Sequence, residues 1–159
     1  MAQSYKTWVR WLGGRRGHIR LGNGPEMDFA APPDAHGEVG VLTPEDAFVA
    51  AVNTCIHMMF IWAAERLKLD LVSYECEAEG LKEVRLDQTE EFTKVVLRPH
   101  IVVRGADERR VQRALQAARK YSLIAESVKC AVIIEPAIII LPVGQVGQVA
   151  NLPHEEEPC

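Results

Sequence analysis

The chain has 159 residues, of which 48% are hydrophobic and 25% charged, and its formal net charge is −4. This composition is typical of one globular domain with a single hydrophobic core, and a net negative chain has no basic field to attract nucleic acid. We therefore expect a single domain over residues 1–141 and no nucleic-acid partner. Residues 142–159 are rich in Gly, Pro and Glu, which predicts a flexible C-terminal tail.

The N-terminal part of the chain predicts an antiparallel meander. Residues 5–12, 18–21 and 26–30 have the composition of short strands, and Gly-containing turns separate them. Residues 31–42 are rich in Pro and Gly, which predicts a loop that leads into the next element.

Residues 43–68 predict a long helix around which the rest of the chain is organised. Thr43 is a good N-cap, Pro44 suits the first helical position, and Asp46 can complete a capping box. Apolar residues then cover nearly every side of the helix over residues 47–64, a pattern that predicts burial.

The same helix approaches membrane-spanning length. Because Asn53, Thr54 and His57 interrupt the apolar run, we expect a buried core helix and no membrane association. Residues 1–14 show no secretory signal pattern, so we expect a cytoplasmic location with reduced thiols. One small sheet cannot cover so apolar a helix, and we therefore expect an obligate homodimer.

The middle of the chain predicts a strand pair. Residues 71–79 alternate between apolar and polar positions, which places Cys76 on the core face of a strand. Residues 90–104 predict its partner. The intervening residues 80–89 are charged, and they fit either a ribbon extending the two strands or a plain loop.

The last third of the chain predicts a second helix over residues 107–121, with Asp107 at its start. Four residues spaced four, three and four apart lie along one helical face: Val111, Leu115, Ala118 and Ser122. Ser122 is thus expected on the inward stripe of the helix or just past its end. A short helical turn follows at residues 124–129. Residues 130–141 are strongly β-branched and predict a last, buried strand with a bulge or edge position at Pro136. Strand groups interrupted by helices predict an α+β fold with mainly antiparallel sheets.

Three features of the sequence can be read as chemistry. Cys55 lies in the middle of the long helix, Glu45 lies in its first turn, and Arg15 and Arg16 follow a Gly-Gly turn. An arginine can stabilise a reactive thiolate, and a carboxylate can orient that arginine. The residues alone leave other interpretations open: Cys55 as a small buried hydrophobe, Glu45 as a helix-end charge and Arg15 as a solvated turn residue.

Two motifs resemble those of the OsmC/Ohr family of thiol-dependent hydroperoxide reductases. GGRRG at residues 13–17 resembles the family's GGRxG turn, and Pro44-Glu45 with Cys55 ten residues later resembles its central helix. The resemblance implies that Cys55, Arg15 and Glu45 are catalytic. Arg15 is preferred over Arg16 because it directly follows the second glycine.

The resemblance also implies an intertwined α+β homodimer with active sites at the subunit interface. In that family a cysteine thiolate attacks an organic hydroperoxide and becomes sulfenic acid. A second cysteine then forms a disulfide, which an external dithiol reduces, and no bound cofactor is needed.

The sequence departs from the family at that second, resolving cysteine. Ser122 occupies its place in the segment Lys120-Tyr121-Ser122-Leu123, and a serine hydroxyl cannot form a disulfide. Cys76, Cys130 and Cys159 are the remaining thiols, and we do not expect them to substitute.

We therefore expect thiol-dependent reduction of organic hydroperoxides through Cys55 in a one-cysteine or impaired mode, with an external thiol or dithiol as reductant. The alternative is a non-peroxidase member with a stress-response role or a small hydrophobic ligand. An inert, purely structural Cys55 is the third possibility.

The remaining conspicuous residues have ordinary explanations. His57 is interpreted as a hydrogen-bonded core or interface histidine. The apolar run of Met58, Met59, Phe60 and Trp62 is expected in the core or dimer interface, where the resemblance places the hydroperoxide pocket. Residues 155–157 are a solvated acidic run. The sequence predicts no metal site.

Overall fold

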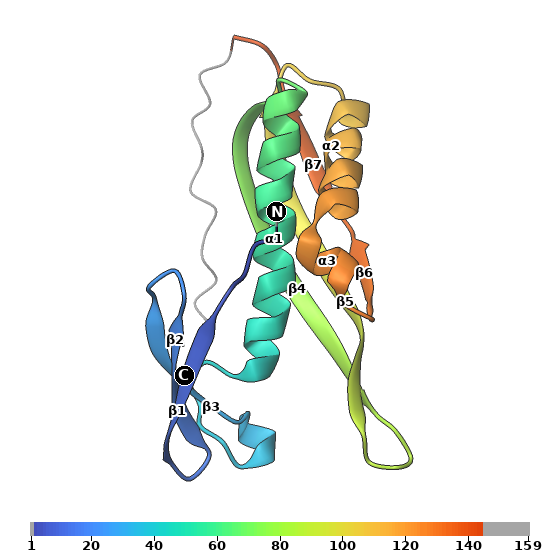
Figure 1. Cartoon of the computed structure of the whole chain (residues 1–159). Helices are drawn as coiled ribbons and strands as arrows, with labels where there is room; N and C mark the ends of the chain where they lie inside the picture. Colours follow the sequence, from blue (N-terminus) through green and yellow to red (C-terminus); the bar gives the residue numbers. More distant parts are fainter. Residues whose placement is uncertain (1, 145–159) are drawn as a thin grey trace, which may run out of the picture.

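The computed structural model describes residues 2–144, so the predictions for Cys159, residues 155–157 and most of the tail lie outside the described residues. Two sheets and three α-helices form an α+β fold (Figure 1). The smaller sheet is an antiparallel meander of β1 (Thr7–Gly13), β2 (Arg16–Leu21) and β3 (Glu26–Ala30), in that order. The predicted meander is therefore confirmed, with small shifts at its strand ends.

The larger sheet is built on a long antiparallel pair, β4 (Asp70–Val84) and β5 (Glu90–Arg104). Of the two options for residues 80–89, the structure shows the ribbon, because β4 continues to Val84. Two short strands, β6 (Ala131–Ile134) and β7 (Ala137–Leu141), both pair parallel to β5.

The single, buried last strand predicted for residues 130–141 is wrong in two respects. It is divided into β6 and β7 at Glu135 and Pro136, and Ile133 and Ile139 are about two-fifths exposed, at 39% and 43%. Proline has no N–H to donate to a ladder, so pairing with β5 lapses there after Glu135 donates its N–H to Leu97. These strands lie at the sheet edge, where one face stays open.

The helices begin where their caps predict. In α1 (Pro44–Arg66), the Thr43 hydroxyl accepts the Asp46 N–H at 3.1 Å. Asp107 accepts the Arg110 N–H at 2.8 Å and so caps α2 (Glu108–Tyr121). The predicted short turn is α3 (Leu123–Ser127), and a 3₁₀ turn, η1 (Pro33–Ala35), lies in the loop before α1.

The helices lie against the larger sheet (Figure 1). The core lies between them, in two clusters along α1. One cluster joins the second half of α1 to β5 and α2, with Phe60, Ile101 and Val111 all fully buried. The other joins the first half of α1 to β5 and α3 through Val52, Ile56, Val95, Leu97 and Ala125. The junction between α2 and α3 therefore falls near the middle of α1, where Cys55 lies.

One side of α1 remains uncovered in the single chain. Met58 is 62% exposed, and Trp11 on the neighbouring sheet is 76% exposed. By length and composition α1 is the one helix in the described residues that could cross a membrane, and 28% of its most apolar window is buried. The buried core helix predicted from sequence is thus buried on one side.

Candidate functional site

The structure brings Cys55 and Ser122 together, although 67 positions separate them in the chain. The two side chains lie 3.1 Å apart, from the Ser122 Oγ to the Cys55 Sγ. Cys55 is half-buried on α1, whereas Ser122 is completely buried between α2 and α3. Ser122 lies just past the end of α2, one of the two positions predicted from its spacing with Ala118, and its hydroxyl reaches toward α1.

The turn between β1 and β2 carries the two candidate arginines. Gly13 and Gly14 have φ angles of +109° and +51°, a left-handed conformation that glycine adopts without a steric penalty. The Trp11 indole N–H donates to the Gly14 carbonyl at 3.0 Å and closes the turn. This geometry presents Arg15 at the surface and directs the chain into β2.

The two arginines differ in their partners. Arg16 forms ion pairs with Asp28 at 2.7 Å and Glu38 at 2.5 Å. Hydrogen bonds from His18 and Arg16 lower the pKa of the Asp28 carboxyl. Arg15 is exposed and donates one hydrogen bond to the Ala35 carbonyl, and it has no carboxylate partner within residues 2–144. Arg15 is therefore the arginine of this turn whose charge remains unneutralised.

Glu45 lies in the first turn of α1 and is half-buried. Its Oε2 atom is shielded from solvent and has no hydrogen-bond partner among the described residues. The pKa of nearby Lys82 is raised chiefly by its hydrogen bond to Glu90, and the charges of Asp34 and Glu45 contribute less. A buried carboxylate oxygen without a donor is costly, so Glu45 needs a hydrogen-bond donor that residues 2–144 do not supply.

The predicted Arg15, Glu45 and Cys55 set is not assembled within a single chain. Across the described residues no hydrogen bond or ion pair joins any two of the three. Their roles stay predictions. Sequence reasoning did identify both side chains of the contact that the structure does form, Cys55 and Ser122.

The other described cysteines lie on the core. Cys76 of β4 and Cys130, just before β6, pack against the same cluster as Val52 and Ile56. Burial raises the pKa of the Cys76 thiol. The predicted position of Cys76 on the core face of its strand is confirmed.

We expect Cys76 to be a slow thiol at neutral pH. A raised pKa keeps the proton on sulfur to higher pH, so the thiolate that reacts with iodoacetamide is scarcer than in a free cysteine. Site-resolved mass spectrometry should show Cys76 alkylated more slowly than a cysteine peptide at pH 7, with the difference narrowing as the pH rises. Equal rates at pH 7 would contradict this expectation.

The His57 side chain of α1 packs against β4 of the larger sheet. Its ring stacks on Tyr74 of β4, with 4.6 Å between the ring centroids and 5° between the planes. The side chain is half-buried, and within the described residues stacking, rather than the predicted side-chain hydrogen bond, holds the imidazole. Across residues 2–144 no cluster of His, Cys, Asp and Glu has the arrangement of a metal site.

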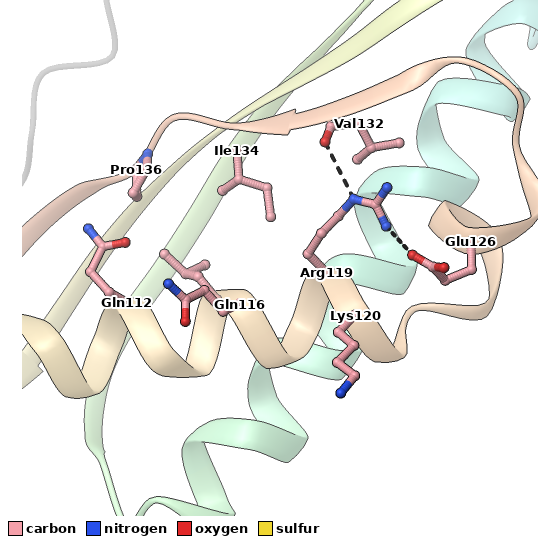
Figure 2. Close-up of a pocket in the computed structure, with 9 residues that line it drawn as sticks. Gln112, Gln116, Arg119, Lys120, Glu126, Val132, Ile134 and Pro136 are labelled. Carbon is pink, nitrogen blue, oxygen red and sulfur yellow. Dashed lines mark hydrogen bonds and ion pairs between the residues drawn. The ribbon is translucent and has the colours of Figure 1, made fainter.

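Two cavities could hold a small molecule, and their positions relative to Cys55 matter for any chemistry of its thiol. An apolar cavity of about 290 Å³ lies where α1 meets the smaller sheet, lined by Val9, Ile19, Phe29, Leu42, Thr43, Pro44 and Ala47. A larger cleft of about 550 Å³ lies between α2 and β6. In it the Arg119 guanidinium donates to the Val132 carbonyl at 3.4 Å and to the Glu126 carboxylate at 2.5 Å, and Figure 2 shows both contacts. Neither cavity includes Cys55 in its lining. The larger cleft had no signal in the sequence, because α2 and β6 meet through tertiary packing.

The chain matches a family model described as OsmC-like protein over residues 36–137. This range contains Glu45, Cys55 and Ser122 but not Arg15. No curated protein matches the chain in sequence.

Solved structures share the fold. An OsmC-like protein of unknown function from Vibrio cholerae is 23% identical, with a TM-score of 0.78 over 86% of this chain and 100% of that chain. An organic hydroperoxide resistance protein OsmC from Legionella pneumophila is 18% identical, with a TM-score of 0.66 over 87% and 98%. Organic hydroperoxide resistance protein OhrB of Bacillus subtilis is 20% identical, with a TM-score of 0.60 over 86% and 98%. At these identities the likeness establishes the α+β fold predicted from sequence.

Proposed function

Because the chain belongs to the OsmC-like protein family, we propose that it reduces organic hydroperoxides with Cys55 and uses an external thiol in place of a second cysteine. The observation that carries this proposal is the 3.1 Å contact between Cys55 and Ser122. It places a half-buried thiol against the position that the family resemblance assigns to the resolving cysteine. Two of the structural relatives are named as hydroperoxide resistance proteins.

The proposed reaction begins with the Cys55 thiolate. It attacks one oxygen of the hydroperoxide, so that an S–O bond forms as the O–O bond breaks, and the departing alkoxide takes a proton to become an alcohol. Cys55 is then a sulfenic acid, which an adjacent thiol could convert to a disulfide. Ser122 offers only a hydroxyl, so the second step passes to a thiol from solution.

The reductant closes the cycle in two steps. A first external thiol attacks the sulfenic sulfur, which gives a mixed disulfide and one water. A second thiol, or the second sulfur of a dithiol, releases Cys55 as the external pair becomes a disulfide. One hydroperoxide and two thiols thus yield one alcohol, one water and one disulfide, and no bound cofactor takes part.

We propose further that two copies of the chain form each site. Among residues 2–144, Glu45 has a buried oxygen without a donor and Arg15 has a charge without a carboxylate partner. The uncovered side of α1, with Met58, and the exposed Trp11 supply apolar surface for a second copy. A charged group of a second copy meeting each of them would satisfy both Arg15 and Glu45. The proposed location is the cytoplasm, where free thiols persist.

A second candidate function is the binding of a small hydrophobic molecule without peroxide turnover. Two observations favour it: Ser122 blocks the disulfide step, and the 290 Å³ cavity at the start of α1 is almost wholly apolar. Stabilisation of the protein by an apolar ligand that it does not consume would support this function.

The experiment that tests the leading proposal is the intact mass of the reduced protein after one equivalent of cumene hydroperoxide, with and without dimedone. The expected result is a dimedone adduct on Cys55. Loss of two hydrogens without an adduct would reveal an unexpected disulfide partner. An unchanged mass would reject the peroxide chemistry and favour the ligand-binding candidate.

A further inference from the structure

The buried hydroxyl of Ser122 has two hydrogen-bonding neighbours. Its Oγ accepts the Ala125 N–H at 3.1 Å, which caps α3, and it lies 3.1 Å from the Cys55 Sγ. The side chain is 0% exposed. With no solvent at the hydroxyl, these two neighbours decide how its single hydrogen is oriented.

The number of donors and acceptors on a hydroxyl group determines which partner donates in the contact between Ser122 and Cys55. A serine hydroxyl has one hydrogen to donate and two lone pairs to accept with. The Ala125 N–H already supplies a hydrogen to one lone pair, so the hydroxyl hydrogen is free to point at Cys55. A thiolate accepts such a hydrogen bond more strongly than a thiol does, because bonds to charged acceptors are the stronger ones.

We propose that Ser122 is a positioning residue that donates its hydroxyl hydrogen to the Cys55 sulfur and so favours the reactive thiolate. This inference deepens the proposed function and rests on Cys55 being the reacting thiol. The serine takes the place of a redox partner but cannot itself be oxidised to a disulfide. It therefore activates the first step while leaving the second step to an external thiol.

The hydroxyl has a structural role as well, because the bond from Ala125 stabilises α3. A variant that merely loosens α3 must therefore be separated from one that removes the donor to sulfur. Ser127 offers the matched control: it lies on the same short helix, and its hydroxyl donates to the Leu123 carbonyl at 2.7 Å and not to Cys55.

The test is the pH profile of Cys55 alkylation by iodoacetamide, read on the Cys55 peptide by mass spectrometry. In Ser122→Ala the alkylation rate below the midpoint of the profile should fall about tenfold, the order expected from losing one hydrogen bond to a charged group. Ser127→Ala should leave the profile unchanged. An unaltered profile in Ser122→Ala, with a melting temperature lowered as in Ser127→Ala, would overturn the inference. Capping α3 would then be the only role of the Ser122 hydroxyl.

A second variant covers the case in which Ser122→Ala does not fold. Ser122→Cys keeps the side-chain size and places a sulfur where the hydroxyl lies beside Cys55. Mild oxidation with diamide should then join positions 55 and 122 in a disulfide, seen as a loss of two hydrogens that wild type lacks. Absence of that bond in a folded variant would contradict the geometry on which the inference depends.

The readouts distinguish this inference from the proposed function. Alkylation and diamide oxidation require no hydroperoxide, so both can succeed for a protein that never reduces one. Conversely, a dimedone adduct on wild-type Cys55 together with an unaltered alkylation profile in Ser122→Ala would leave the peroxide chemistry standing and remove Ser122 from it.

Discussion

Replacing Cys55 by serine is expected to lower hydroperoxide consumption to the rate measured without protein. The serine hydroxyl is not ionised near neutral pH and has no sulfenic acid state, so neither the attack on the O–O bond nor the external thiol step can proceed. The measurement is loss of cumene hydroperoxide with excess dithiothreitol, alongside dimedone labelling. Both signals should disappear together in Cys55→Ser.

Two matched controls accompany this variant. Cys76→Ser and Cys130→Ser each remove one thiol that packs against the same core cluster, and within the described residues neither forms a hydrogen bond with Cys55. A melting temperature should first show that each variant is folded. Each folded variant should then keep hydroperoxide turnover and the dimedone adduct on Cys55. Turnover that survives in Cys55→Ser would move the reaction to another thiol. Turnover lost in folded Cys130→Ser would show that Cys130 takes part.

The helices of this chain were predictable because their signals are local. Thr43 and Asp107 each accept the N–H three residues ahead, as a capping residue does, and both helices begin beside them. The inward face of α2 followed from spacing alone, and the same spacing pointed to Ser122, which lies just past the helix end and is fully buried. Local helical spacing therefore identified Ser122, one of the two side chains in the contact with Cys55.

The sheet was harder to predict because pairing is decided between distant segments. The β-branched run before and after Pro136 has strand character, but nothing within it encodes parallel pairing to β5 or exposure of alternate residues. The ribbon formed by β4 beyond Gly80 likewise depends on the matching strand across the turn. In both places the deciding contacts come from β5. This strand is tens of residues away from β6 and β7, and it is separated from β4 by a charged turn.

The proposed active site shows the same division between what sequence patterns reveal and what requires a structure. The motif residues were identified by resemblance, yet within residues 2–144 Arg15 has no carboxylate partner and the Glu45 Oε2 atom accepts no hydrogen bond. A sequence cannot say whether such groups meet within one chain or between two. The buried, partnerless oxygen of Glu45 is the structural observation that favours two chains.

Removing the charge of Arg15 is expected to slow the reaction of Cys55 with hydroperoxide by about 10²-fold, the order observed when one preorganised electrostatic group is removed from an active site. Arg15→Met retains much of the side-chain length and deletes the guanidinium. Arg16→Met is the matched control, because Arg16 already binds Asp28 and Glu38. It should lose some stability while its single-turnover rate of sulfenic acid formation remains near that of wild type.

Mixing two inactive variants tests where the arginine comes from. If Arg15 of the partner subunit serves Cys55, a mixed dimer of Cys55→Ser and Arg15→Met contains one intact site, because one chain supplies the thiol and the other the guanidinium. Random pairing makes half of the dimers mixed, with one of two sites restored, so co-refolding should recover about a quarter of wild-type activity. If Arg15 instead serves the thiol of its own chain, every site lacks one group. The co-refolded mixture then stays as inactive as the separate variants, which would exclude a site shared between subunits.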